Sequence, residues 1–501
     1  MSQLARPLRK SLRTKPLMND SSSNADASTP ISLSEIDASC RLPLFLMFVS
    51  AAVWLVLASA FALISTLAFH KPDLFANCAA LTYGRARPAY LNSVLYGFCL
   101  QAGLAVGLWL ILRLGRITLT HRWIITIGGM LWNLGVTAGV IGILAGDGTG
   151  FENLDMPYYA ALLIFFGYLL FGIWTVLMFH QRRERPLFIS QWFLLAALFW
   201  FPWIYSTGYL LLVNFPVRGM TQAIIGWWCS NNLLVVWLGL VGLASVFYFV
   251  PKLTNRDLHS HYLALLTFWT LILVGSWGGI PASAPVPAWI PSLSCALTIL
   301  MLIPLLTVTL NLYGTLQGQS ASVKSNISLQ FIVLGVLGFI VAGLMNIAAA
   351  MPQVSQITNF TWFTVARNHA QFYGFFSLVM FGSVYHIVPQ LAGIEFPSEK
   401  LVRAHLWLAT LGILLIIVPM AVGGVVQGFK LQDPNIPFID VSKGTLPFLR
   451  ASSIGDLLLA AGHVVFFINV AGLVSRFSSA RAAAAYALAT ADLFKTAEAK
   501  P

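Results

Sequence analysis

The chain has 501 residues, of which 58% are hydrophobic and 9% are charged, and its mean hydropathy is +0.79. Soluble domains carry roughly 25% charged residues, so this composition excludes a water-soluble protein and indicates an integral membrane protein. The net charge of +12 is better explained by basic loops that orient a membrane protein than by nucleic-acid binding. The five cysteines form no CxxC or CxxCH pattern, which argues against a disulfide framework, a zinc site and covalently attached c-type haem.

Residues 1–40 begin with a basic stretch and continue as the polar run SSSNADASTP. This pattern predicts a disordered cytoplasmic tail rather than a cleaved signal peptide, because no apolar core directly follows the basic residues. Residues 41–476 predict one all-α membrane domain of twelve transmembrane helices, since each span needs about 20 apolar residues. The Ala-rich segment 477–501 predicts a second cytoplasmic tail, which forms a surface helix or a frayed end.

Short polar loops separate the predicted spans, and none is long enough for another domain. The spans lie near residues 43–69, 89–112, 123–145, 157–180, 187–213, 221–250, 262–280, 290–314, 327–350, 362–393, 402–427 and 451–475. Of the 29 Lys and Arg residues, 21 fall on the side that holds both termini, seven fall on the other side, and Arg367 falls inside a span. Because basic loops stay on the cytoplasmic side of a membrane, both termini are predicted to be cytoplasmic.

The tenth predicted span, 362–393, is unusually polar. It contains Arg367, Asn368, His369, Gln371 and His386. Polar side chains inside a span are costly, and they usually mark a functional site. Positions 367 and 369 lie about 200° apart around a helix, so one helix with ligands at these positions can serve two cofactors, one on each face.

This segment resembles the tenth helix of haem-copper oxidase subunit I. The resemblance is closest to the cbb3-type cytochrome c oxidase, and the nitric oxide reductase large subunit is a relative. Four other segments resemble the second, sixth, seventh and eleventh helices of that family: GRARPAYLN (84–92), WWCSNNLLVVWLGLVGLASVFYFVPK (227–252), LLTFWTLILVGSWGGIP (265–281) and AHLWLATLGILLIIVPMAVGGVVQG (404–428). The resemblance implies a twelve-helix bundle of the subunit I type, in the inner membrane of a bacterium, that works as an oxidoreductase in a respiratory chain.

The family's ligand positions are largely replaced in this chain. The family holds a low-spin haem between histidines of the second and tenth helices, and these positions fall on Tyr90 and His369. The position of its high-spin haem ligand, also on the tenth helix, falls on Arg367. The positions of its three copper ligands, on the sixth and seventh helices, fall on Asn231, Pro281 and Ala282. Copper is therefore not expected, because proline and alanine side chains have no ligand atom and asparagine is a weak copper ligand.

Two interpretations of His369 stay open at this point. In the first, His369 is the axial ligand of one b-type haem, and Tyr90 lies opposite as a phenolate ligand of the kind found in catalase. In the second, His369 is a buried histidine that forms a hydrogen bond with Tyr90 or Gln371, and no haem is bound. His386 lies about 25 Å further along the helix, too far to complete the same haem.

Other polar residues within the spans need partners too. Arg367 is expected to pair with an acidic group, a haem propionate or an anionic lipid, or to reach backbone carbonyls at a kink. Asp456 in the twelfth span is the one acidic candidate that lies well inside a span. His405 and His463, in the eleventh and twelfth spans, are expected to form hydrogen bonds between helices.

The sequence thus predicts a cbb3-like subunit I that has lost copper and at least one haem, with no catalytic residue and no metal site of its own. It is interpreted as a one-haem electron-transfer subunit or a non-catalytic scaffold of a membrane redox complex. Expected partners are membrane lipids, other redox subunits and a separate c-type cytochrome, without nucleic acid. Two alternatives stay open: an active terminal oxidase or nitric oxide reductase with relocated ligands, and a transporter or lipid-binding membrane protein.

Overall fold

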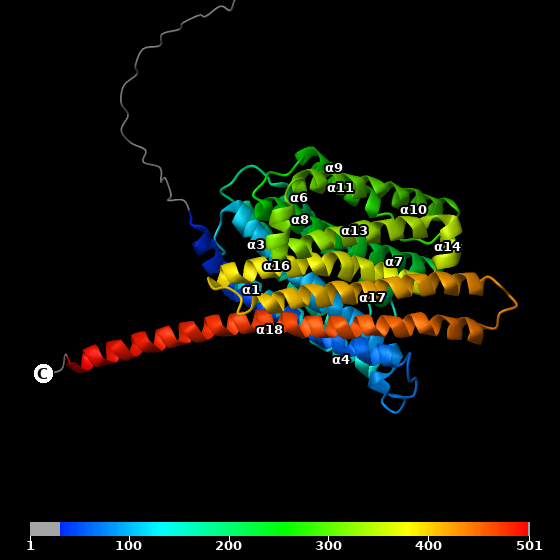
Figure 1. Cartoon of the computed structure of the whole chain (residues 1–501), viewed down its shortest axis with the longest axis horizontal. Helices are drawn as coiled ribbons and strands as arrows, with labels where there is room; N and C mark the ends of the chain where they lie inside the picture. Colours follow the sequence, from blue (N-terminus) through cyan, green and yellow to red (C-terminus); the bar gives the residue numbers. More distant parts are fainter. Residues whose placement is uncertain (1–30, 499–501) are drawn as a thin grey trace, which may run out of the picture.

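The structure is a computed structural model and describes residues 31–498. Helices and their connecting loops make up this region, and no β-strand occurs within it. The helices lie side by side and form a single bundle (Figure 1). Such a bundle pairs the backbone polar groups within each segment, as the interior of a bilayer requires. The all-α membrane fold predicted from the sequence is confirmed.

The first half of the bundle contains α1 (Leu33–Leu67), η1 (Ala79–Leu81), α2 (Tyr83–Asn92), η2 (Ser93–Leu100), α3 (Gln101–Gly115), α4 (Arg122–Ala145), α5 (Tyr158–His180), α6 (Ile189–Tyr209), η3 (Leu210–Asn214), α7 (Met220–Asn231), η4 (Asn232–Trp237) and α8 (Leu238–Thr254). The second half contains α9 (His261–Gly275), α10 (Trp289–Leu300), α11 (Leu302–Leu316), α12 (Ser320–Ser325), α13 (Ile327–Ala350), α14 (Pro352–Thr358), α15 (Trp362–His369), η5 (Ala370–Ser377), α16 (Leu378–Ala392), α17 (Glu399–Leu431) and α18 (Phe438–Glu498). The segments η2, η3, η4 and η5 are π-helical and continue the adjoining helices. Such segments are frequent at functional sites.

The number of spans is close to the prediction. Within residues 31–498, eleven helical stretches are long and apolar enough to cross a membrane. The twelfth, α9, lies at the predicted seventh span but has only 15 residues. It stops at Gly275, and the loop that follows contains Gly279 at a positive φ of 95° and three prolines, Pro281, Pro285 and Pro287, so no long helix continues through this stretch.

The first helix begins earlier than predicted. Residues 1–30 of the predicted tail lie outside the described residues, but residues 33–40 belong to α1, so the prediction of a disordered tail is wrong for this part. Ser32 begins the helix with a capping box, which satisfies the first free backbone N–H groups. Asp37 then forms a buried ion pair with Arg113 of α3 and holds this turn against the bundle.

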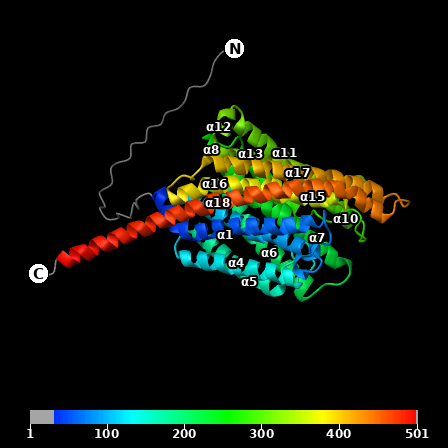
Figure 2. The same ribbon diagram turned by 60° about the horizontal axis from the view of Figure 1, so that its bottom comes forward.

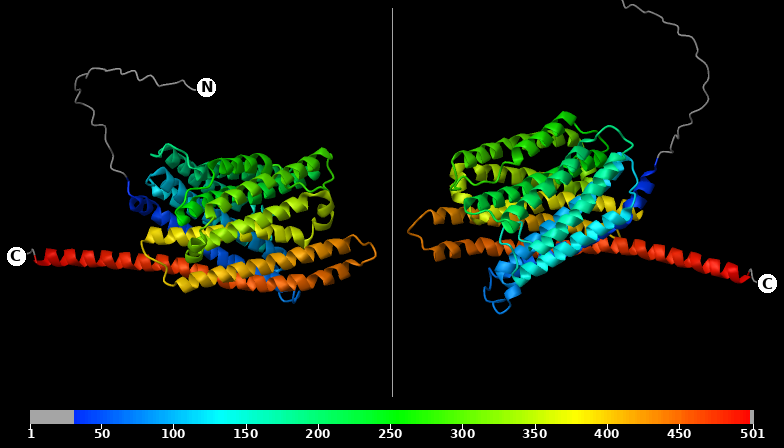
Figure 3. Two further views of the ribbon diagram at one scale, coloured as in Figure 1. Left: turned by 45° about the horizontal axis from the view of Figure 1, so that its top comes forward. Right: turned by 180° about the vertical axis from the view of Figure 1, so that it is seen from behind.

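The two ends of the described chain leave the bundle at the same end. α1 begins where α18 departs, and α7, α10 and α14 lie at the opposite end (Figures 1 and 2). The last part of α18 runs beyond the other helices (Figure 3), and residues 478–488 of this part are exposed. Twelve crossings, α9 included, return the chain to the side on which it starts.

Close contact between α13 and η5 holds the polar tenth span in the bundle. A Cβ atom added to Gly338 would lie 1.8 Å from the carbonyl oxygen of Gly374, so the two backbones touch. Small residues allow this approach between membrane helices, where packing is a main source of stability. The contact fixes how the helix that carries Arg367 and His369 faces its neighbours.

Candidate functional site: a packed contact and a polar cavity

The tenth predicted span is one continuous helix made of α15, η5 and α16. The hydroxyl of Thr361 accepts a hydrogen bond from the N–H of Phe363 and caps its start. Arg367 and His369 then project from nearly opposite faces, as helical geometry requires. The His369 side is packed, with 2% of this residue exposed, whereas Arg367 lines a cavity.

On the packed side, His369 forms a hydrogen bond directly with Tyr90 of α2, and the Nε2 to Oη distance is 3.1 Å. The other ring nitrogen, Nδ1, lies 2.8 Å from the carbonyl oxygen of Val365. A carbonyl only accepts hydrogen bonds, so Nδ1 carries the proton, Nε2 accepts, and the Tyr90 hydroxyl donates. Gln371 plays no part here, because its Nε2 donates to the carbonyl oxygen of Leu234.

This contact does not fit a haem iron between Tyr90 and His369. Metal–nitrogen and metal–oxygen bonds are about 2 Å long, so two axial ligands of one metal lie roughly 4 Å apart. The two atoms are 3.1 Å apart, and the Tyr90 oxygen is held as a proton donor. The rings of Phe372 and Tyr373 pack against His369, with centroids 4.8 and 6.0 Å away.

The buried histidines of α17 and α18 join different helices. Nδ1 of His463 lies 2.6 Å from Oγ of Ser59 in α1, and Nδ1 of His405 lies 2.9 Å from the Tyr385 hydroxyl in α16. These contacts confirm the hydrogen bonds between helices that were expected for both residues. They stabilise the bundle beside the packed site.

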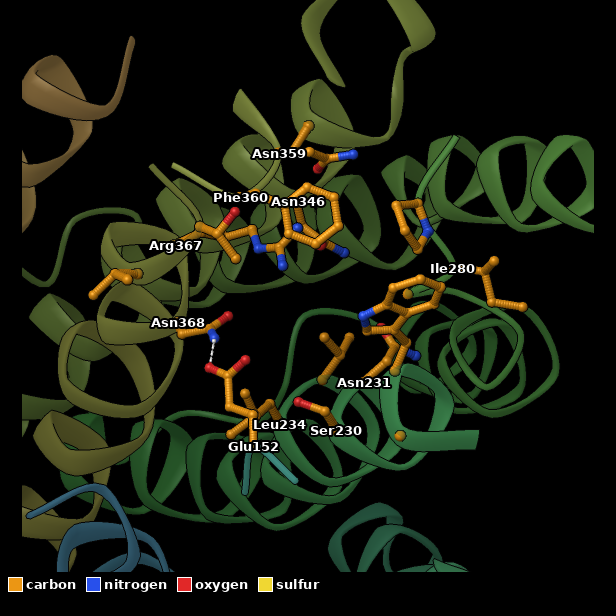
Figure 4. Close-up of a pocket in the computed structure, with 18 of the residues that line it drawn as sticks. Glu152, Ser230, Asn231, Leu234, Ile280, Asn346, Asn359, Phe360, Arg367 and Asn368 are labelled. Carbon is orange, nitrogen blue, oxygen red and sulfur yellow. Dashed lines mark hydrogen bonds between the residues drawn. The ribbon is translucent and has the colours of Figure 1, made fainter. Parts of the chain in front are cut away.

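The opposite side of α15 borders a cavity of about 470 Å³. Three of the positions that the sequence aligned with family ligands line it together: Asn231, Pro281 and Arg367. Asn231 and Arg367 lie on different sides of the cavity (Figure 4). Ala282 follows the lining residue Pro281 in the loop after α9. Other polar residues that line the cavity are Glu152, Gln222, Ser230, Thr298, Asn346, Asn359, Thr361, Thr364, Asn368 and Gln371.

The cavity offers no set of copper ligands. The amide nitrogen of Asn231 donates to the carbonyl oxygen of Gly275 at 2.8 Å, while Pro281 and Ala282 have no ligand atom in their side chains. Throughout the part of the chain that the structure describes, no three His, Cys, Asp or Glu side chains come close enough to share a metal ion. The residues present therefore do not fit a copper centre.

The side chain of Arg367 has no hydrogen bond or ion pair with any residue between 31 and 498. Asp456, the acidic partner that the sequence suggested, lies instead beside Tyr90, on which its charge acts. The acid that acts electrostatically on Arg367 is Glu152. Glu152 accepts a hydrogen bond from the side-chain nitrogen of Asn368 at 3.2 Å (Figure 4).

The loop that carries Glu152, between α4 and α5, connects the two sides of the site. Its Asp155 accepts a hydrogen bond at 2.7 Å from Asn92, two residues after Tyr90. Burial raises the pKa of Asp155 from 3.8 to about 6; the hydrogen bond from Asn92 lowers this pKa and the charge of Glu152 raises it. The sequence analysis missed Glu152, although the loop GDGTGFENLD concentrates acidic residues and was the available signal.

The fold and the replaced ligand positions together define a multi-pass membrane protein of the haem-copper oxidase subunit I type. Residues 43–458 match the model of the family described as cytochrome c and quinol oxidase polypeptide I. The match covers most of the chain, so the protein belongs to this family.

Its relatives include a cbb3-type cytochrome c oxidase subunit of Stutzerimonas stutzeri, which is 26% identical over 78% of this chain and 84% of the relative. A cytochrome c oxidase subunit 1 homologue of Azorhizobium caulinodans is 25% identical over 82% of this chain and 78% of the relative. A nitric oxide reductase subunit of Stutzerimonas stutzeri is 26% identical over 42% of this chain and 46% of the relative. The cbb3-like resemblance is therefore confirmed.

The same fold occurs in a solved structure of a haem-copper terminal oxidase dimer. The TM-score is 0.67 at 15% sequence identity, and the match covers 87% of this chain and 84% of that chain. At this identity the similarity concerns the fold alone. It shows that the cavity and the packed site are set in a bundle of the oxidase type.

Proposed function

We propose that this protein is a non-catalytic scaffold subunit of a membrane redox complex, derived from a cbb3-like oxidase subunit I. It does not reduce dioxygen or nitric oxide at a haem-copper centre. The cavity carries this proposal: Asn231, Pro281 and Arg367 line it together and supply no ligand set for copper or for a second haem. Oxygen reduction in this family needs those redox cofactors, whose chemistry the protein itself cannot replace.

The packed site supports the scaffold over the one-haem electron carrier. His369 Nε2 accepts a hydrogen bond from Tyr90 at 3.1 Å, and this bond occupies the place that an iron atom would need. Both side chains are 2% exposed, so the contact is part of the bundle's packed interior. This geometry favours the scaffold.

The protein is proposed to lie in the inner membrane of a bacterium, with both termini cytoplasmic and with other redox subunits as partners. The start of α1 and the end of α18 at one end of the bundle support a common side for the termini (Figure 1). The excess of Lys and Arg in the loops on that side supports the cytoplasmic assignment. A c-type cytochrome, if the complex uses one, must come from another chain, because this one has no CxxCH motif.

The test is an absorption spectrum of the purified, detergent-solubilised protein, oxidised and dithionite-reduced, with haem and copper measured on the same sample. The scaffold proposal expects a folded protein without stoichiometric haem or copper, and no oxygen consumption with a reduced electron donor. His369→Ala and the control His386→Ala are then equally colourless.

Two results would contradict the proposal in different ways. One b-type haem per chain that disappears in His369→Ala and persists in His386→Ala would make the protein an electron carrier. Full copper occupancy together with oxygen or nitric oxide reduction would make it an active oxidase or reductase with relocated ligands.

A further inference from the structure

Two opposite charges face the cavity without forming an ion pair. The ion pairs found between described side chains join Arg113 with Asp37 and Arg403 with Glu399, and neither of them includes Arg367 or Glu152. The charge of Glu152 nevertheless acts on Arg367, and both side chains line the same space (Figure 4).

None of the N–H groups of the Arg367 guanidinium donates a hydrogen bond to a residue between 31 and 498. This is a costly state for an arginine in a membrane bundle, and ordinarily a partner or water satisfies it. A guanidinium group binds a carboxylate through two parallel hydrogen bonds, which makes it a specific receptor for that group. The carboxylate of Glu152 has one partner, the amide of Asn368, and has further acceptor capacity.

The rest of the lining is suited to a small polar molecule. Six amide side chains border the cavity: Gln222, Asn231, Asn346, Asn359, Asn368 and Gln371. Phe151, Trp227 and Phe360 add aromatic surface. The volume of about 470 Å³ lies within the range of roughly 300–1,000 Å³ that is usual for small-molecule sites.

The two charges select the kind of ligand. An anion without a positive group would be attracted by Arg367 and repelled by Glu152. A cation without a negative group would be attracted by Glu152 and repelled by Arg367. A molecule that carries both a carboxylate and an ammonium group complements both side chains at once. We propose that this cavity binds a small zwitterionic solute of the α-amino acid class, with its carboxylate on Arg367 and its ammonium group on Glu152.

This inference rests on the proposed function in one respect, because a cavity filled by a haem-copper centre would have no room for the solute. The site would lie where the family carries out its chemistry, but it would serve recognition only. The ligand would enter from the end of the bundle opposite the chain termini, where the loop that carries Glu152 and the loop before α15 meet the cavity.

The test is isothermal titration calorimetry of the full-length protein in detergent with the standard α-amino acids, one at a time. For any amino acid that binds, its N-acetyl derivative and its methyl ester are titrated as well, so that each charge is removed in turn. The proposal expects both derivatives to bind roughly tenfold more weakly or worse, because each loses a charge-assisted hydrogen bond.

Variants connect the binding to the two side chains. Arg367→Gln and Glu152→Gln should each weaken binding roughly tenfold or more, and Glu152→Gln should remove the preference over the N-acetyl derivative. Arg367→Lys, which keeps the charge without the paired donors, should weaken binding less than Arg367→Gln. The matched controls Arg403→Gln and Glu399→Gln change an exposed ion pair elsewhere and should leave the affinity unchanged.

Several results would overturn the inference. It fails if no α-amino acid binds the metal-free protein, or if the Arg367 and Glu152 variants bind the amino acid as tightly as the unmodified protein does. It also fails if inorganic phosphate or acetate binds as tightly as the amino acid. Haem and copper analysis of the same preparation keeps the two proposals apart. Stoichiometric haem or copper contradicts the proposed function, whereas a metal-free protein that binds no amino acid contradicts this inference alone.

Discussion

The two faces of α15 differ in how tightly their polar side chains are packed. On one face, His369 and Tyr90 touch each other, both are buried, and aromatic rings surround them. On the other face, Arg367 borders a polar cavity of about 470 Å³, and its side chain forms no hydrogen bond or ion pair with residues 31–498. The two residues are only two positions apart in the sequence.

The size and polarity of the side chains at the two sites explain this difference. A tyrosine at position 90 is long enough to reach His369 and to satisfy its free nitrogen. Pro281 and Asn231 line the second site without filling it, and burying a guanidinium group away from water without a hydrogen-bond partner is costly. One site therefore closes by direct contact, whereas the other stays open and polar, which is where a ligand can bind.

The largest expected effect is the loss of packing in Tyr90→Ala. Truncation of a buried aromatic side chain costs about 3–5 kcal/mol, and here it also leaves Nε2 of His369 without a hydrogen bond. The midpoint of thermal unfolding in detergent should fall markedly. The control Tyr262→Ala, at a tyrosine that is 84% exposed, should leave it nearly unchanged. Equal midpoints for the two variants would contradict a packed site.

The second prediction concerns Asp155, in the loop that connects the two sides. Burial raises its pKa from 3.8 to about 6, so between these values the folded protein holds the proton more tightly than the unfolded chain does. The free energy of unfolding should therefore fall by about 2–3 kcal/mol as the pH rises from about 4 to about 6, and stay at the lower level above that.

Unfolding measured against pH tests this prediction. Asp155→Asn should remove that part of the pH dependence, and Asp147→Asn, at an exposed position of the same loop, should keep it. Stability that rises over this range because of Asp155 would mean that the carboxylate is stabilised rather than penalised by its surroundings.

A smaller effect is expected from Tyr90→Phe, which keeps the ring and removes the hydroxyl. The loss of one buried hydrogen bond costs about 1–2 kcal/mol. In a protein that already carries His369→Leu, Tyr90→Phe should lower the free energy of unfolding by less, because the hydrogen-bond acceptor is absent. A double-mutant cycle measures the coupling energy between the two side chains. A cycle without coupling would show that the 3.1 Å contact contributes nothing to stability.

The smallest effect on stability is expected on the cavity side. Arg367→Gln removes no hydrogen bond or ion pair within residues 31–498, so the free energy of unfolding should change by less than about 0.5 kcal/mol. Arg113→Gln is the contrasting variant, because it leaves the buried Asp37 unpaired and should cost about 3–5 kcal/mol. A large loss in Arg367→Gln would show that the arginine is a structural residue rather than part of a binding site.

Much of this protein could be predicted from its sequence. Apolar runs and basic loops predict the spans, because the bilayer imposes length, hydropathy and charge asymmetry directly on the chain. The polar cluster of the tenth span and the resemblance to the oxidase family are enough to locate Tyr90, Asn231, Pro281, Arg367 and His369. The sequence did not reveal the start of α1, because Ser32 directly follows a polar run. This first part of the helix depends on the capping box at Ser32 and on the buried ion pair between Asp37 and Arg113.

Only the tertiary structure determined which contacts these residues form. The sequence allowed His369 to bind a haem with Tyr90 or to form a hydrogen bond with Tyr90 or Gln371, and only the positions of α2 and α15 bring Nε2 to 3.1 Å from the Tyr90 hydroxyl. The sequence also left Arg367 without a known partner. The fold brings Glu152, from a loop more than 200 residues away, into the same cavity, where its charge acts on Arg367. Such long-range neighbours are set by how the helices pack, and that packing depends on many weak contacts that no local pattern records.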